Sequence, residues 1–152
     1  MSNPSVNNFM AVYPLLIERL KGIDGISHVL EASQLAELLN QGGARLTVPM
    51  DDAVYVVFDG MKPVETRATQ ARVQLSFTLY LAKAYYKTGN LNLTQAGEMM
   101  TNILLTVLGW DARVDNDFYL TKPFTAVNPP SVIYNDGFAL YPVSFQCECS
   151  IG

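Results

Sequence analysis

The sequence feature that most constrains the fold is a strict alternation of residue types that begins at Arg72. Its apolar members are Val73, Leu75, Phe77, Leu79 and Leu81, separated by Gln74, Ser76, Thr78, Tyr80 and Ala82. Successive side chains of a β-strand point to opposite faces, so this period of two predicts a strand with one face inward and one outward. Continued to Tyr86, the strand would be about 45–50 Å long, whereas a domain of this size is about 40 Å across. We therefore expect its far end, residues 81–90, to protrude or curl.

The remaining segments predict a single α+β domain over residues 1–152, with a mostly antiparallel sheet and helices packed on one face. Apolar residues at helical spacing predict helices over 8–21, 33–40 and 94–108, ended by Gly22, Gly42–Gly43 and Gly109. Further strands are expected over 26–30, 53–58, 118–120 and 138–149, the last in a hairpin with 133–134. Residues 59–70 are expected to form a loop that begins with a turn at Asp59–Gly60, and residues 111–130 are expected to be largely irregular.

Long strands favour association with another chain. The run Ala53–Phe58 is apolar throughout and predicts a strand buried on both faces. Pro142 lies within the last strand and cannot donate a hydrogen bond to a neighbour, which predicts an edge position or a bulge there. Open strand edges pair readily with other chains. We therefore predict a homo-oligomer whose interface uses strand ends and the basic segment described next.

The charges are unevenly distributed. The net charge of −4 and the pI of about 4.8 argue against a nucleic-acid-binding protein. Residues 62–87 are nevertheless basic, with Glu65 opposed by Lys62, Arg67, Arg72, Lys83 and Lys87. This segment is either a solvated surface or a basic face that meets an acidic face of another subunit. The candidate subunit or partner interface consists of Met61, Lys62, Arg67, Arg72, Lys83, Tyr85, Tyr86 and Lys87.

The two cysteines, Cys147 and Cys149, are the residues that most suggest chemistry. In a strand they share a side with Val143 and Phe145, so they continue an apolar row and are interpreted as core residues. A zinc site needs about four ligands, and the remaining soft ligand, His28, is expected to be an outward polar residue of a strand.

The acidic residues give no stronger signal. The aspartates of 111–117 lack the glycine and terminal glutamate of an EF-hand and are expected in a solvated loop, while Asp51–Asp52 is expected to mark a turn. We expect no catalytic, metal or cofactor site and no enzymatic activity.

Composition predicts a globular chain, with 49% hydrophobic and 16% charged residues. No apolar run reaches the roughly 18 residues of a membrane span, and the segment MSNPSVNNF is unlike a signal peptide. The expectation is a protein made and kept in a reducing cytosol.

The order of several segments resembles the tail terminator proteins of long-tailed bacteriophages, in particular the Mu-like branch with contractile tails. They are YPLLIERLKGIDGISHVLEA, AVYVVFDGM, ATQARVQLSFTLYLAKAYY, LLTVLGW and YNDGFALYPVSFQCE. The resemblance implies an α+β fold and a hexameric ring in the virion tail, assembled in the cytoplasm of the bacterial host. Such a ring sits on the tail tube protein, stops tube polymerisation, joins the neck or connector protein and touches the sheath protein where there is one. DNA passes through its lumen without specific binding. Another minor tail or neck protein, or a small-ligand binding module, remains an alternative.

Overall fold

A computed structural model of the chain describes residues 8–31, 33, 51–84, 91–114, 118–120, 122–135 and 137–152. The helices are η1 (Phe9–Ala11), α1 (Val12–Lys21) and α3 (Leu91–Val107). The strands are β1 (His28–Glu31), β2 (Ala53–Arg67), β3 (Gln70–Ala84), β4 (Arg113–Val114), β5 (Phe118–Tyr119), β6 (Lys122–Val127), β7 (Ile133–Asn135) and β8 (Phe138–Ile151). Apart from Ser33, the helix expected over 33–40 lies outside the described residues.

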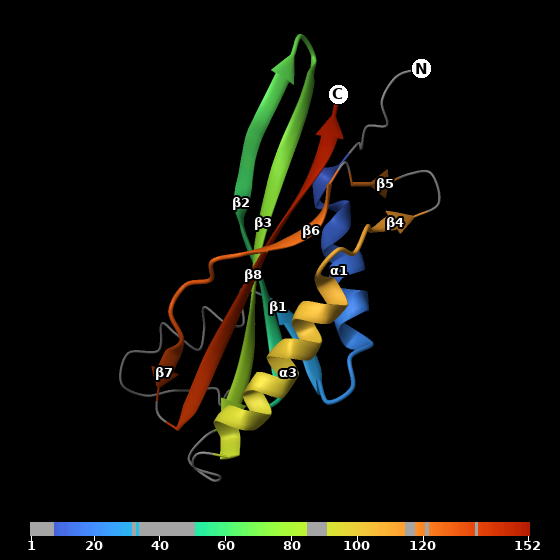
Figure 1. Cartoon of the computed structure of the whole chain (residues 1–152). Coiled ribbons are helices and arrows are strands. Elements are labelled where there is room, and N and C mark those ends of the chain that lie inside the picture. Colours follow the sequence, from blue (N-terminus) through green and yellow to red (C-terminus); the bar gives the residue numbers. More distant parts are fainter. Residues whose placement is uncertain are drawn as a thin grey trace.

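The main sheet has six strands in the order β1-β2-β3-β8-β6, with β7 also on β8, and β4 and β5 form a separate pair (Figure 1). The β1–β2 pair is parallel and the other pairs are antiparallel. The predicted α+β class and mostly antiparallel sheet are therefore confirmed. The expectation that the helices pack on one face extends to residues 33–40 and stays a prediction.

The alternating segment forms the centre of the sheet. β3 pairs along its whole length with β8, from Ala71 opposite Ile151 to Ala84 opposite Phe138, without a register shift. All of the apolar members of the alternation are buried, and they face the main core cluster together with residues of α1, α3 and β8. Burying a large apolar side chain stabilises a fold by about 1.5–3 kcal/mol. The strand predicted from Arg72 is confirmed, and it begins slightly earlier, at Gln70.

The opposite face of the sheet changes character along its length. At one end a second apolar cluster contains Ala53, Tyr55, Ala82, Phe138 and Leu140. Near the middle, the buried hydroxyls of Thr78 and Ser144 lie 2.9 Å apart. Ala53–Val56 is buried throughout, which confirms the prediction of a strand buried on both faces for these residues, whereas Val57 and Phe58 are half-buried. The face expected to point outward is thus largely covered at this end of the sheet.

The helix α3 ends where the sequence predicts. Gly109 follows its last turn with a φ of +76°, in the left-handed region that glycine adopts without strain. Arg19 of α1 donates from Nε to the carbonyl oxygen of Thr106 at 2.8 Å, and its guanidinium lies 4.9 Å from the centre of the Trp110 ring. A cation at the carboxyl end of a helix interacts favourably with the helix dipole and so stabilises the helix. The apolar stripe predicted for this helix consists of Met100, Ile103, Leu104, Val107 and Leu108, and it is wrong for Leu108, which is exposed.

The expectation of an irregular segment over 111–130 is wrong for residues 122–127, which form β6 against β8. Trp110 explains how β6 is held in place. Its ring stacks on Phe124 at 5.4 Å, and the Phe124 amide donates to the Trp110 carbonyl oxygen at 3.2 Å. Aromatic burial and a backbone hydrogen bond therefore fix a strand that lacks a clear alternating pattern.

The largest correction concerns residues 59–70, which do not form a loop. β2 continues through Arg67 and pairs with β3, with register shifts between Phe58 and Gly60 and between Pro63 and Glu65. Asp59–Gly60 is a bulge rather than a turn, because Gly60 adopts a φ of +136° that admits an extra residue in the strand. The turn lies at Ala68–Thr69, between the paired residues Arg67 and Gln70.

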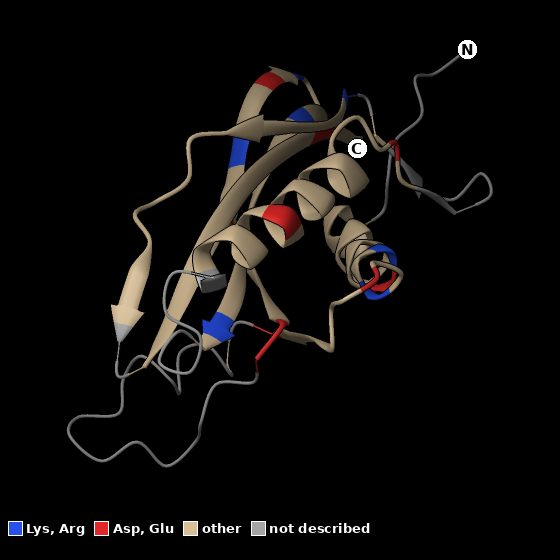
Figure 2. Cartoon of the chain, turned by 60° about the horizontal axis from the view of Figure 1, so that its bottom comes forward, with Lys and Arg blue, Asp and Glu red and all other residues tan. Residues whose placement is uncertain are grey.

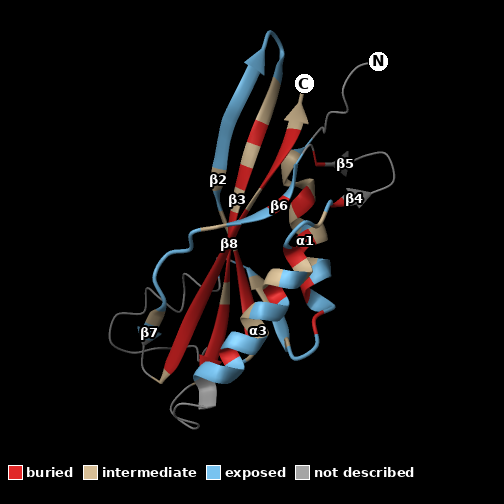
Figure 3. Cartoon of the chain, viewed as in Figure 1, coloured by how far each residue is buried: buried red, intermediate tan, exposed pale blue. Residues whose placement is uncertain are grey.

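Residues 60–70, here called the arm, form the end of the β2–β3 hairpin that projects past the helices (Figure 1). Every residue from Met61 to Gln70 is exposed, whereas the other end of the hairpin is buried (Figure 3). The expectation that residues 81–90 protrude is wrong for 81–83, which are buried, and residues 85–90 lie outside the described part of the chain. The projecting end is the opposite one.

Pro142 occupies a local edge. It pairs with Tyr80 of β3 without a register shift. On the other side of β8, the pairing with β7 ends at Leu140 and the pairing with β6 begins at Ser144. On this side of β8, Pro142 therefore lies in the gap between the two described partner strands, where no ladder hydrogen bond from its backbone nitrogen is needed. This agrees with the prediction of an edge position.

Candidate assembly interface

The cysteines are structural residues. Cys147 and Cys149 are free thiols buried in the main core cluster, which confirms their interpretation as core residues. Burial raises the pKa of Cys149 to about 11. Burial, followed by the neighbouring Cys149 and Glu148, also raises the pKa of Cys147. Since the thiolate is the reactive form, both groups are poor nucleophiles at neutral pH.

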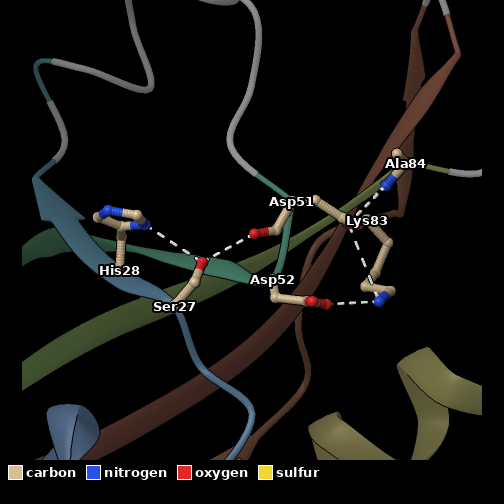
Figure 4. Close-up of polar contacts among 6 residues, drawn as sticks. All are labelled: Ser27, His28, Asp51, Asp52, Lys83 and Ala84. Atoms are coloured by element: carbon tan, nitrogen blue, oxygen red, sulfur yellow. Dashed lines mark hydrogen bonds and ion pairs between the residues drawn. The ribbon is translucent and has the colours of Figure 1, made fainter.

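His28 and Ser27 lie together at the start of β1 but do not form a catalytic pair (Figure 4). The Ser27 hydroxyl donates to the backbone carbonyl oxygen of Asp51 at 2.8 Å. The His28 Nδ1 atom lies 3.2 Å from the same hydroxyl oxygen, so the imidazole is placed to donate to it rather than to remove its proton. His28 is exposed on a strand, as predicted.

Asp51 and Asp52 form the expected turn and also bind the end of β3 (Figure 4). Lys83 Nζ lies 2.5 Å from Asp52 Oδ1 and 3.9 Å from Asp51 Oδ1. The Asp51 carboxylate also accepts a hydrogen bond from the Ala84 amide at 2.9 Å. Lys83 is only 5% exposed. This candidate interface residue therefore carries a charge that is already compensated within the chain.

Arg72 is a second candidate whose charge is used internally. Its guanidinium lies 3.3 Å from Glu65 on β2 and 3.0 Å from Glu148 on β8, the latter contact being an ion pair without hydrogen-bond geometry. Lys122 of β6 approaches the other oxygen of Glu148 at 3.4 Å. Glu148 is buried, so these two cations compensate a carboxylate that is largely removed from water. The row joins four adjacent strands near the turn of the arm, where Glu65 pairs with Arg72.

The arm presents the remaining candidates to solvent. Arg67 is highly exposed and pairs with Glu65 at 3.1 Å. Lys62 is exposed, and among the described Lys and Arg side chains it is the one without a polar or aromatic partner. Met61 and Val64 are 42% and 38% exposed. The arm thus combines exposed apolar side chains with an unpaired positive charge. Tyr85, Tyr86 and Lys87 lie outside the described residues.

The free edge of the sheet runs along the arm. β1 pairs with β2 only from Ala53 to Val56, so beyond Val56 no described strand lies on that side of β2. Backbone N–H and C=O groups on this edge are available to another chain, while Pro63 and the two register shifts interrupt its regularity. These residues were predicted to form a loop, so the sequence did not indicate this edge.

The outer face of α3 is a further surface that the sequence analysis missed. Leu93, Leu105 and Leu108 are exposed on it. Glu98 is the one charged residue of this helix, whereas α1 exposes Glu18, Arg19 and Lys21 (Figure 2). A surface helix normally carries charged residues on its solvent face. Leu93 and Leu105 were a signal in the sequence, since they fall outside the predicted inward stripe of the helix, whereas Leu108 was predicted to lie within it.

Within the described residues, no group of three or more His, Cys, Asp or Glu side chains is arranged to hold a metal ion. No described helix is both long and apolar enough to cross a membrane. What distinguishes the molecule is an exposed arm with a free strand edge and an apolar helix face. These features are suited to association with other chains.

Comparison with known proteins agrees with that description. The family model described as phage tail terminator protein matches residues 6–152, nearly the whole chain. No curated protein matches the chain significantly. The match extends over the arm, the central strand, α1, α3 and β8. The chain therefore belongs to the phage tail terminator protein family, a family of structural components of the phage tail.

Proposed function

We propose that the protein forms a hexameric ring that caps the tail tube, stops its polymerisation and offers a surface to the neck or connector. The observation that carries this proposal is the family match over residues 6–152. The partners are further copies of the chain, the tube protein, the neck protein and, in a contractile tail, the sheath protein. Assembly takes place in the cytoplasm of the bacterial host, and the ring becomes part of the virion.

The exposed arm supports a role in assembly. A closed ring of identical subunits uses a heterologous interface, in which two different surfaces of each copy meet. The arm offers one such surface, with a free strand edge on β2 and exposed apolar side chains at Met61 and Val64. An isolated chain gains nothing from apolar side chains on a projecting hairpin. In a ring they are removed from water by a neighbour.

Charge complementarity is proposed to set the register between neighbours. Lys83 and Arg72 are held within the chain, so on the described part of the basic segment the unpaired charge is that of Lys62. Arg67 pairs with Glu65, but its side chain is highly exposed and can also reach a neighbour. DNA passes through the ring lumen, and the net charge of −4 would limit its retention there.

The decisive experiment mixes the purified protein with polymerising tube protein and measures tube lengths by negative-stain electron microscopy. A terminator shortens the length distribution and adds a ring to one tube end, and the protein by itself shows six-fold rings. Tubes that grow to unchanged lengths with no terminal density would contradict the proposal. A neck protein that is not a terminator would bind finished tails without limiting the growth of tubes.

The charge hypothesis has its own test. Arg67→Glu reverses an exposed charge and should lower ring mass in light scattering while the thermal unfolding of the subunit is retained. Arg72→Glu is the matched comparison, because it places a carboxylate beside Glu65 and Glu148 and should destabilise the subunit itself. Unchanged assembly of the Arg67→Glu protein would remove Arg67 from the interface.

The small-ligand alternative has little support on the described surface. A pocket lies between Glu65, Arg67 and Arg72 of the hairpin and Ser150 and Ile151 of β8. Its arginines already pair with carboxylates of the same chain. A ligand site of the usual kind is mainly apolar with a few free polar groups. A protein that is monomeric at all concentrations would favour this alternative.

A further inference from the structure

The outer face of α3 carries an apolar stripe that the described chain leaves uncovered. Leu93 and Leu105 are 61% and 71% exposed, and Leu108 is 49% exposed. Gly97 and Thr101 lie between the leucines at intervals of four residues, so these positions share one side of the helix. A Cβ built on Gly97 would meet nothing within 4 Å, and the stripe therefore has a shallow, open centre.

The arm has the complementary properties. It exposes Met61 and Val64, and together the arm and α3 hold most of the large apolar side chains that are exposed in the described residues. Lys62 on the arm and Glu98 on α3 have opposite charges. Within the described part of the chain, neither side chain has an ion-pair partner.

The two surfaces are also similar in length. The strand from Gly60 to Arg67 spans about 26 Å at roughly 3.3 Å per residue. The 17 residues of α3 extend for about 25 Å at 1.5 Å per residue. The arm forms one end of the sheet and projects past the helices, whereas α3 begins near the other end (Figure 1). Two different surfaces placed in this way are what a heterologous contact requires.

We propose that the arm of one copy lies along the α3 stripe of the next copy in the ring. With the arm antiparallel to α3, Met61 packs against Leu105 and Leu108, and Val64 lies about 10 Å further along the helix, over Gly97 and Thr101. Lys62, between them on the strand, pairs with Glu98. Because β2 is the edge strand here, side chains from both of its faces can contact a helix that lies along the edge. This inference rests on the ring-forming function proposed above and identifies the two surfaces that meet.

The first test joins the two surfaces covalently. One protein carries Met61→Cys and a second carries Leu105→Cys, and the two are mixed and treated with a short bifunctional maleimide. Each keeps the buried Cys147 and Cys149, whose raised pKa values make them slow to react. We expect a cross-linked dimer in this mixture. The control replaces the second protein with Val132→Cys, at another exposed apolar residue, and should give none. Equal product in both mixtures, or none in either, overturns the contact.

The second test uses charge reversal. Lys62→Glu and Glu98→Lys should each weaken assembly about two- to five-fold per contact, as expected for an exposed ion pair. The double variant restores the pair with its charges exchanged and should assemble to within about two-fold of the wild type. Sedimentation velocity over a range of concentrations measures the effect. If the double variant weakens assembly by the sum of the two single effects, the pairing is overturned.

Failure of this contact and failure of the proposed function are distinguishable. Wild-type rings that cap tubes while the Met61–Leu105 cross-link never forms would overturn the contact and leave the terminator function standing. A wild-type chain that is monomeric both alone and in the presence of tubes would overturn both.

Discussion

The two ends of the β2–β3 hairpin belong to the same pair of strands but have opposite environments. At one end Lys83 is buried and held by the Asp51–Asp52 turn, and apolar clusters lie on both faces of the sheet. At the other end, from Met61 to Gln70, every residue is exposed and the strand edge is open. The difference shows that residues of the same two strands can have different roles, depending on what packs beside them. One end stabilises the subunit, and the other is available for assembly.

The largest expected contrast comes from truncating one side chain in the core and one on the arm. Phe77→Ala removes a fully buried ring at the centre of the core and should lower the free energy of unfolding by about 3–5 kcal/mol. Val64→Ala on the arm should change it by less than about 0.5 kcal/mol. Urea unfolding followed by circular dichroism measures both. A large loss of stability for Val64→Ala would mean that the arm is part of the folding core.

The ionic contact at the buried end supplies the next comparison. Asp52→Ala leaves the buried ammonium of Lys83 without its 2.5 Å partner and should cost about 2 kcal/mol of unfolding free energy. Arg67→Ala removes an exposed ion pair on the arm and should cost about 0–1 kcal/mol. Equal effects of the two substitutions in the same urea experiment would remove the distinction between the ends.

The buried thiols predict a pH dependence at alkaline pH. Burial raises the pKa of Cys149 from 9.0 to about 11. The unfolded chain therefore loses this proton first, so stability is fully present below about pH 9 and falls as the pH rises through about 11. The fall has a slope of about 1.4 kcal/mol per pH unit for one group. Cys149→Ala should flatten the stability profile in this range, and an unchanged slope would exclude a contribution from this thiol.

The smallest expected effect lies at the tip of the arm. Ala68 adopts a φ of +49°, in the left-handed region that is unfavourable for a residue with a Cβ. Ala68→Gly relieves this strain and should stabilise the subunit by roughly 0.5–1 kcal/mol, observed as a small rise in the thermal midpoint. A lower midpoint would show that the relief of strain is smaller than the cost of the greater conformational entropy that glycine gives to the unfolded chain.

Several elements were predictable because their signal is local. The alternation after Arg72, the apolar stripe of α1 and the stop at Gly109 each follow from side-chain spacing and backbone preference. The placement of both cysteines in the core followed from the same alternation. The loop predicted over 59–70 failed because neither face of the arm is buried, so no apolar period marks it. Those residues form a strand because β3 offers them a backbone partner.

The candidate interface stays a prediction, but the structure shows that some of its charges are already paired within the chain. Sequence reasoning identified the basic segment and Met61, but it treated Lys83 and Arg72 as available charges. Their partners, Asp52 and Glu148, are distant in sequence and become neighbours only when β2, β3 and β8 pair. Part of the apolar outer face of α3 was visible in the sequence as Leu93 and Leu105, which lie outside the predicted inward stripe. Its exposure became known only when the neighbours of the helix were placed.

By itself, the sequence determined that the chain is an α+β protein built on one long central strand, and the order of its segments carried the resemblance to the tail terminator family. Periodic burial and glycine conformations are encoded within a few residues, so they can be read without a fold. Tertiary structure alone decided which end of the hairpin projects and which charges stay free. Both depend on pairing between strands that are far apart along the chain, because a strand edge or a carboxylate is satisfied only by what lies beside it in space.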